Sequence, residues 1–190
     1  VDQLRDAGLH RLNISLDTLR ADRFRALTRR DRLDDVLAGV AAARGSGLRP
    51  LKLNAVAMRG VNDDELGDLL AFALANDAEL RFIEQMPLDA GHTWRRDNMV
   101  SADDILHELG LRFDLQPLDD DPANPASLWE VNGGPARVGV IASVTRPFCA
   151  GCDRLRLTAD GELRNCLFGH DEYKLTDLIR AGADDARLAE

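Results

Sequence analysis

Strand-like and helix-like segments alternate over the first 86 residues, and this alternation limits the folds open to the chain. Between the strands, apolar residues repeat with helical spacing over residues 33–41. Asn62, followed three residues later by Glu65, predicts a capping box that opens the next helix. Strands joined by helices in this order predict right-handed βαβ units and a parallel sheet. The predicted strands are residues 11–16, 51–58 and 80–86.

The pattern changes after Pro87. Ser101 predicts the cap of a short helix, and Ala159-Asp160-Gly161 is typical of a hairpin turn. We therefore expect an α/β fold in which a βα half, residues 1–86, is followed by a region of antiparallel strands, residues 87–190. The strands expected in the second region are residues 127–131, 137–142, 154–158 and 162–167.

Composition excludes several classes of protein. The chain has 190 residues and a formal net charge of −9, which argues against nucleic acid as a partner. It contains no apolar run of the roughly 20 residues that cross a bilayer, and no signal peptide. We therefore expect no membrane partner and a cytoplasmic location. Because the chain begins at Val1 without Met and ends in a helical pattern, we expect a segment of a longer protein.

Polar residues interrupt the three predicted parallel strands. Strands covered by helices on both faces are normally continuous apolar runs, and burying an unpaired polar group costs about 2–7 kcal/mol. We expect these residues to line a polar ligand site, although they can also face solvent or bond to one another. They are Asn13 and Ser15, Lys52 and Asn54, and Arg81 and Glu84. The residues expected near the carboxyl ends of the strands, where such folds bind ligands, are Ser15, Lys52, Asn54 and Met86.

The three cysteines have the spacing Cys-x2-Cys-x13-Cys. The predicted hairpin folds Cys166 back towards Cys149 and Cys152, so the spacing indicates one metal site. An iron–sulfur cluster with three thiolate ligands and one open iron is the preferred interpretation. Three alternatives stay open: a Cys3His zinc site completed by His170, a thioredoxin-like redox pair, and unligated thiols.

Arginines surround the cysteine motif. Arg154 and Arg156 alternate directly after Cys152 and so share one face of a strand, while Arg164 lies on the return strand. Guanidinium groups bind phosphate and carboxylate in a bidentate manner, which indicates an anionic ligand. A solvated arginine face is the alternative.

These segments together carry a family resemblance. Phe148–Phe168 resembles the carboxyl-terminal cluster motif of the GTP 3′,8-cyclase family, the radical S-adenosylmethionine (SAM) enzymes that open molybdenum cofactor synthesis. Further segments resemble the family in the same order along the chain. They are residues 12–17, 51–54, 60–65 and 81–86.

The resemblance implies a fold, a reaction and two partners. The family fold is an incomplete triosephosphate-isomerase (TIM)-type barrel followed by a carboxyl-terminal region. The implied activity is that of a lyase that converts GTP to 3′,8-cyclo-7,8-dihydro-GTP, with a 5′-deoxyadenosyl radical abstracting hydrogen from C3′. The implied partners are a downstream cyclic pyranopterin monophosphate synthase and, as one option, a second copy of the chain.

The resemblance also implies site residues and cofactors. The auxiliary 4Fe-4S cluster is ligated by Cys149, Cys152 and Cys166. GTP contacts Lys52, Arg154, Leu155 and Arg156. SAM lies near Ser15 and Met86, and Asn54 and Arg81 are weaker candidates for the same lining.

The chain departs from the family pattern in three respects, of which two are the absence of the barrel strands expected before Arg11 and of the glycine-ending carboxyl-terminal tail. The Cys-x3-Cys-x2-Cys motif of the SAM-cleaving 4Fe-4S cluster does not occur in these 190 residues, so we expect this segment alone to be inactive. Two other functions stay open: another radical SAM enzyme with an auxiliary cluster, and a non-enzymatic Cys3His zinc module.

Overall fold

The computed structural model describes residues 1–88, 94–119, 124–169 and 173–188. The chain forms two compact units, Val1–Phe148 and Cys149–Glu190. No described helix is long and apolar enough to cross a membrane.

The first unit is built on one mixed sheet of six strands in the order β1-β2-β3-β6-β5-β4. Strands β1, β2, β3 and β6 are parallel neighbours, whereas β5 and β4 add to them in antiparallel pairs. The strands are β1 (Leu12–Ser15), β2 (Leu51–Ala57), β3 (Glu79–Glu84), β4 (Leu115–Pro117), β5 (Ser127–Val131) and β6 (Arg137–Ile141). The prediction of an α/β fold with βαβ units is therefore confirmed.

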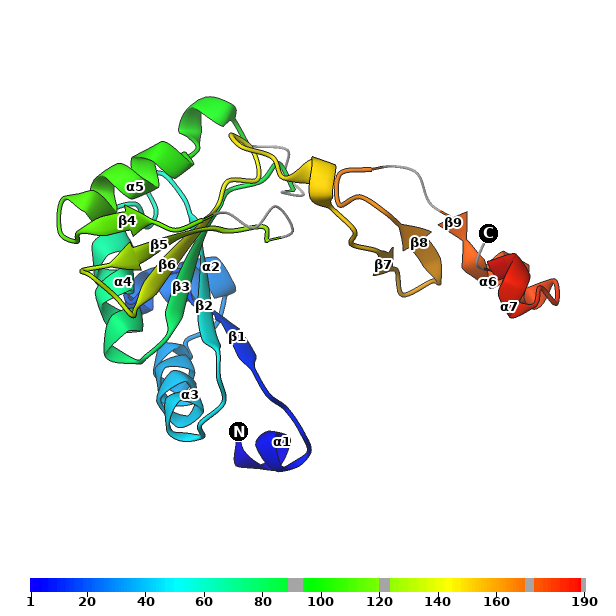
Figure 1. Ribbon diagram of the computed structural model, residues 1–190, viewed down its shortest axis with the longest axis horizontal. Coiled ribbons are helices and arrows are strands. Elements are labelled where there is room, and N and C mark those ends of the chain that lie inside the picture. Colours follow the sequence, from blue (N-terminus) through cyan, green and yellow to red (C-terminus); the bar gives the residue numbers. More distant parts are fainter. Residues whose placement is uncertain (89–93, 120–123, 170–172, 189–190) are drawn as a thin grey trace. The chain divides into compact units, whose positions relative to one another are not determined.

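Helices cover one face of this sheet. Figure 1 shows α3, α4 and α5 lying along it, and their apolar side chains share one core with the strands. The helices are α1 (Asp2–Asp6), α2 (Ala21–Thr28), α3 (Leu33–Gly45), α4 (Leu66–Ala75) and α5 (Ala102–Gly110), with a 3-10 turn, η1 (Arg96–Asn98).

Strand periodicity explains why the other face differs. In β2 the side chains of Leu51, Leu53 and Ala55 are buried against the helices, while those of Lys52 and Asn54 between them are half-buried. The same alternation runs through β3. Because successive side chains point to opposite faces, one sheet face is apolar and the other carries the polar residues that the sequence singled out.

The antiparallel strands expected after Pro87 are present, since β4, β5 and β6 pair in this way, and β6 also joins the sheet parallel to β3. One prediction about these elements is wrong. Asn62 does not cap α4, which begins at Leu66 after Glu65. The Asn62 amide is buried instead, where it donates to the carbonyls of Asp17 (2.7 Å) and Val56 (2.9 Å).

The second unit is small and centres on a three-stranded antiparallel sheet, β7-β8-β9. The predicted hairpin is confirmed: the Gly161 amide donates to the carbonyl of Thr158, and Gly161 has φ +84°. The side chains described in this unit are all at least partly exposed. Its elements are the turn η2 (Cys149–Gly151), β7 (Arg156–Leu157), β8 (Glu162–Arg164), β9 (Tyr173–Lys174), α6 (Leu175–Arg180) and α7 (Asp185–Leu188).

Candidate functional site

The polar residues of the first unit lie in two rows across the parallel strands. Residues paired in register share a face, so each row runs from strand to strand. The first row is Asn13, Lys52 and Glu79, and the second is Ser15, Asn54, Arg81 and Gly139. We call the six residues other than Gly139 the polar face.

Charges on the polar face are paired. The Glu79 carboxylate accepts a hydrogen bond from Arg81 Nε at 2.7 Å, and Lys52 Nζ lies 3.7 Å from the same oxygen. The three side chains are only 21% (Lys52), 17% (Glu79) and 13% (Arg81) exposed, so water screens them less than it would at the surface. The group holds two cations and one anion.

Asn54 lies in the middle of the second row. Its Oδ1 atom is buried and has no hydrogen-bond partner among the described residues. A buried acceptor without a donor costs free energy, so this atom favours a ligand that donates a hydrogen bond here. Its neighbours across the strands are Ser15 and Arg81.

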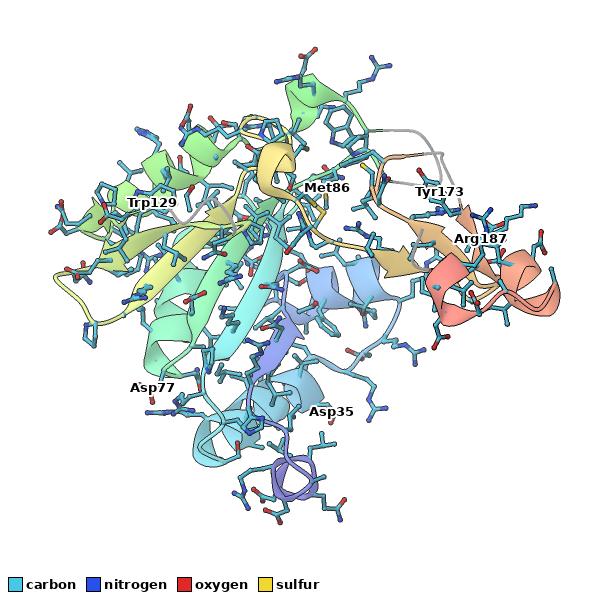
Figure 2. All side chains as sticks on the ribbon, turned by 45° about the vertical axis from the view of Figure 1, so that its right-hand side comes forward. Asp35, Asp77, Met86, Trp129, Tyr173 and Arg187 are labelled. Atoms are coloured by element: carbon cyan, nitrogen blue, oxygen red, sulfur yellow. The ribbon has the colours of Figure 1, made fainter. Side chains whose placement is uncertain are left out.

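The expected placement at the carboxyl ends of the strands holds for Ser15 and Met86 but not for Lys52, and Asn54 lies in the middle of β2. Ser15 ends β1 and Met86 follows β3, but Lys52 is the second residue of β2 and lies near its amino end. Figure 2 shows Met86 and Asp77 at the two ends of β3. The sheet therefore places Ser15 and Met86, the candidate SAM residues, closer to the carboxyl ends of the strands than Lys52, the candidate phosphate residue.

Glu84 was expected in the same lining, but it lies on the opposite face. It is three residues after Arg81, and an odd separation along a strand reverses the side. Its buried carboxylate accepts hydrogen bonds from the amides of Ala102, Val144 and Thr145, each at 2.8 Å, and from Thr145 Oγ1 at 2.5 Å. Glu84 therefore joins the end of β3 to the start of α5 and to the loop after β6.

A second buried carboxylate shapes the loop after β1. Glu65 accepts from Thr18 Oγ1 (2.7 Å), the Leu19 amide (2.9 Å) and Arg23 Nη1 (2.6 Å). Nearby, Asp17 Oδ1 accepts from the Val56 amide at 2.8 Å, and burial raises the Asp17 pKa above its usual value. These contacts hold the loop that follows Ser15.

The hairpin of the second unit carries the cysteines at its open end. Cys152 precedes β7 and Cys166 follows β8, so both are at the end opposite the Asp160 turn. All three thiols are free and exposed. Across the described ranges, no three His, Cys, Asp or Glu side chains form a group that could hold a metal ion, so assembly of the thiols around one centre stays a prediction. His170 lies outside the described residues.

Arg154 acts directly on one of these thiols. Its Nε lies 3.3 Å from Cys152 Sγ, and hydrogen bonds from its backbone and side chain lower the Cys152 pKa, aided by the positive charge of Arg154 and Arg156. Thiolate is the form that binds iron and zinc. The donor chemistry therefore fits a thiolate-ligated metal group.

Arg156 faces Arg164 directly across the β7–β8 pair. Like charges placed opposite each other on a sheet are destabilising unless an anion lies between them. Arg156 Nη1 is buried and makes no hydrogen bond within the part of the chain that is described. Leu155, between the two candidate arginines, has a side chain that is 65% exposed. The hairpin thus favours an anionic ligand.

Glu79 is the candidate site residue that the sequence interpretation missed. A signal was present, because Glu79 and Arg81 are two apart and so share the face that Lys52 and Asn54 occupy. The expected strand began at Leu80, one residue too late to include Glu79.

Two family models cover nearly the whole chain. Residues 78–190 match Molybdenum Cofactor Synthesis C, and residues 1–73 match the Radical SAM superfamily. The chain belongs to the molybdenum cofactor synthesis C family. The resemblance drawn from the cysteine motif is thereby confirmed.

Several curated relatives of this molybdenum cofactor synthesis C chain are named GTP 3′,8-cyclase. Proteins called GTP 3′,8-cyclase from Streptomyces coelicolor and Rhodococcus opacus are 58% identical over 188 residues and 53% identical over 190 residues. These matches cover 98% and 100% of this chain and 55% and 54% of the relatives. A GTP 3′,8-cyclase from Mycolicibacterium smegmatis is 52% identical over 191 residues, covering 97% of this chain and 53% of that relative. The chain thus spans about half the length of the curated relatives it matches.

Proposed function

We propose that this chain is part of a radical SAM GTP 3′,8-cyclase, which converts GTP to 3′,8-cyclo-7,8-dihydro-GTP in the first step of molybdenum cofactor synthesis. The observation that carries the proposal is identity of 52–58% to proteins of that name over nearly the whole chain. The proposed setting is the cytoplasm, with a cyclic pyranopterin monophosphate synthase acting next and a homodimer as one assembly. We also propose a partial TIM-type barrel, divided from the cluster region near residue 86.

The second unit would hold an auxiliary 4Fe-4S cluster through Cys149, Cys152 and Cys166. When bound, the cluster supplies an iron with an open coordination position for the guanine. The lowered Cys152 pKa supports thiolate ligation at this residue. Arg154, the Leu155 backbone and Arg156 would orient the nucleotide. The Nη1 atom of Arg156, which has no hydrogen-bond partner among the described residues, supports this role.

The first unit would hold the rest of the reactants on the polar face. Lys52 would bind the triphosphate, and Ser15 and Met86 would contact SAM. Asn54 and Arg81 would line the same face, and the Oδ1 atom of Asn54, which no described residue satisfies, supports a ligand there. The protein contributes charge and orientation, while the radical chemistry belongs to the cofactors.

Reconstitution of the full-length protein with iron and sulfide under anaerobic conditions tests the proposal. With SAM, a reductant and GTP, we expect 5′-deoxyadenosine and the cyclised nucleotide. Cys149→Ala should lower the iron content by about one cluster per chain. Colourless protein with one zinc ion, or iron content unchanged in Cys149→Ala, would contradict the ligand assignment.

The 190-residue segment provides a control for the same assay. It contains the three hairpin cysteines and no others, so it should bind one cluster and release no 5′-deoxyadenosine. Release of 5′-deoxyadenosine by the purified segment would show that SAM cleavage does not need a further cysteine motif.

A further inference from the structure

Glu79 places one carboxylate oxygen between two cations on the polar face. Oε1 lies 2.7 Å from Arg81 Nε and 3.7 Å from Lys52 Nζ. Both cations are thus already partly neutralised by a residue of the protein. No step of the proposed reaction uses this carboxylate.

The sheet backbone fixes this arrangement. Lys52 and Glu79 are direct partners in the β2–β3 register, and Arg81 follows Glu79 by two residues on the same face. Gly139 is the partner of Arg81 on β6, and a Cβ atom there would lie 3.2 Å from Arg81 Cγ. The absence of a side chain at Gly139 therefore leaves room for the Arg81 stem across the sheet.

The two contacts of Glu79 differ in strength. The short hydrogen bond to Glu79 anchors Arg81. Lys52 Nζ lies 3.7 Å from the same carboxylate, so Lys52 forms an ion pair with Glu79 but no hydrogen bond. A small anion that bridges both cations has to take the position of the carboxylate or lie against it. Like charges in contact are strongly unfavourable where exposure to water is low.

We propose that Glu79 is a specificity-determining residue, an internal counter-ion that keeps inorganic phosphates from occupying the Lys52–Arg81 pair. A phosphate chain that is held elsewhere by its nucleotide can approach Lys52 from one side and leave the Glu79–Arg81 contact intact. A free inorganic anion has no other anchor and cannot offset the repulsion. The inference rests on the proposed function in one point only, that the ligand which still binds is a nucleotide triphosphate.

Titration calorimetry of inorganic pyrophosphate into the full-length protein tests this inference. Glu79→Gln keeps the shape of the side chain and removes its charge, so pyrophosphate should bind about 10-fold more tightly or better than to the wild type. A gain of binding cannot come from misfolding. Unchanged or weaker pyrophosphate binding in Glu79→Gln would overturn the inference.

Matched variants separate the local effect from net charge. Glu108 is exposed on α5, so Glu108→Gln makes the same change in net charge away from the polar face and should leave pyrophosphate affinity at the wild-type value. Glu79→Asp, which keeps the charge, should not gain affinity. Adding Lys52→Ala to Glu79→Gln should abolish the gain, and a gain that persists would place the anion elsewhere and overturn the inference.

The same titrations are independent of the cyclase assay. Pyrophosphate binding needs neither SAM nor turnover. A protein that gains pyrophosphate affinity in Glu79→Gln but forms no cyclised nucleotide would support the inference and refute the proposed function. If the protein has cyclase activity but Glu79→Gln gains no pyrophosphate affinity, the proposed function is supported and the inference is refuted.

Discussion

Three glutamates of the first unit show how the surroundings of a carboxylate set its role. Glu84 and Glu65 are fully buried and are each satisfied by several donors, which makes them structural. Glu79 is partly exposed and shared between two side-chain cations, which are groups that a ligand can also engage. The contrast with Glu84 lies in the donors, since its backbone amides stay in place when a ligand binds, whereas long cationic side chains can move.

Glu84→Gln should destabilise the protein by about 3 kcal/mol. The new amide group would face either the donors on Val144 and Thr145 or those on Ala102 and Thr145, so at least one N–H group would lose its acceptor. Urea unfolding followed by circular dichroism measures the change. Glu108→Gln, on the exposed side of α5, is the control and should change the unfolding free energy by less than about 0.5 kcal/mol.

Asp17→Asn should stabilise the protein at neutral pH. Burial raises the folded-state pKa of Asp17 above its unfolded value, so as pH rises through this window the unfolded state loses its proton first. The contribution of protonated Asp17 to the free energy of unfolding is therefore fully present below the pKa of the unfolded state. It is lost as pH rises through the pKa of the folded state. The neutral amide keeps an acceptor for the Val56 amide and avoids this loss.

The difference in unfolding free energy between Asp17→Asn and wild type should accordingly grow from pH 3.5 towards pH 7. This range starts just below the ordinary pKa of an aspartate side chain, about 3.9. Exposed Asp119→Asn is the control and should show no such growth. A constant difference across this range would show that the Asp17 charge is not penalised by folding.

Two helix starts with similar sequence signals show, at the scale of elements, where sequence reasoning works. Ser101 caps α5 as predicted, with Asp104 completing a capping box. Asn62 and Glu65 form no such box before α4. A capping pattern is local, and it predicts well where both side chains still reach the first helical turn, as at Ser101 and Asp104, although Asp104 also accepts from Arg59. Asn62 and Glu65 bond to Asp17 and Thr18, more than 40 residues away, and such contacts cannot be read from spacing.

The polar face could be predicted only in part, because its strand periodicity is local but the alignment of neighbouring strands is not. Strand periodicity put Lys52 and Asn54 on one face, and the register of β2 with β3 adds Arg81 to that face. Periodicity cannot give the position of a residue along its strand, because that depends on where the strand starts. The prediction that Lys52 lies near the carboxyl end of its strand is wrong for this reason. The turn signal Ala159-Asp160-Gly161 predicted the hairpin, but neither it nor the cysteine spacing could test how the thiols come together.

Ser101→Ala should cost about 1 kcal/mol of stability, because the Asp104 amide at the start of α5 loses its acceptor. Chemical denaturation measures the loss. Ser101→Asn, which retains a capping oxygen, should recover most of it. Equal losses in both variants would show that the Ser101 hydroxyl does not act through the cap.

Gly161→Ala should disrupt the hairpin of the second unit. Gly161 has φ +84°, and an added Cβ would lie 2.1 Å from Thr176 Cγ2, so the variant incurs both backbone strain and a clash at the start of α6. Gly182→Ala is the matched control, since its φ is +83° but, apart from its chain neighbours, no described residue has an atom within 4 Å of the added Cβ.

Hydrogen exchange of the amides in residues 156–164 separates these two costs. Backbone strain alone should cost about 1 kcal/mol in Gly182→Ala and leave the exchange of the hairpin amides near that of the wild type. The hairpin amides should exchange markedly faster in Gly161→Ala. Similar exchange in both variants would remove the clash with Thr176 as a cause.

The two units differ, at the scale of the whole molecule, in how they can be stable. The first has a continuous buried core that includes Phe82, Leu70 and Ile105. In the second, no side chain that the structure describes is buried, and Leu157, Tyr173 and Ile179 are more than half exposed. Segments of about 40 residues or fewer usually need a metal, disulfides or a partner to fold stably. With free thiols at the hairpin, ligation of a metal group is the stabilising element we propose for the second unit.

Limited proteolysis of the full-length protein, with and without anaerobic reconstitution by iron and sulfide, tests this account. In metal-free protein we expect cleavage within residues 149–188 well before cleavage within residues 12–141, because local opening is easiest where little apolar surface is buried. Reconstitution should slow the first set of cuts by about 10-fold or more and leave the second set unchanged, since binding stabilises only the folded form that holds the ligand. Cys166→Ala should abolish this protection, whereas Arg156→Ala, which removes no thiol, should retain it while weakening GTP binding. Equal cleavage of the hairpin with and without metal would mean that contacts other than the thiols hold the second unit together.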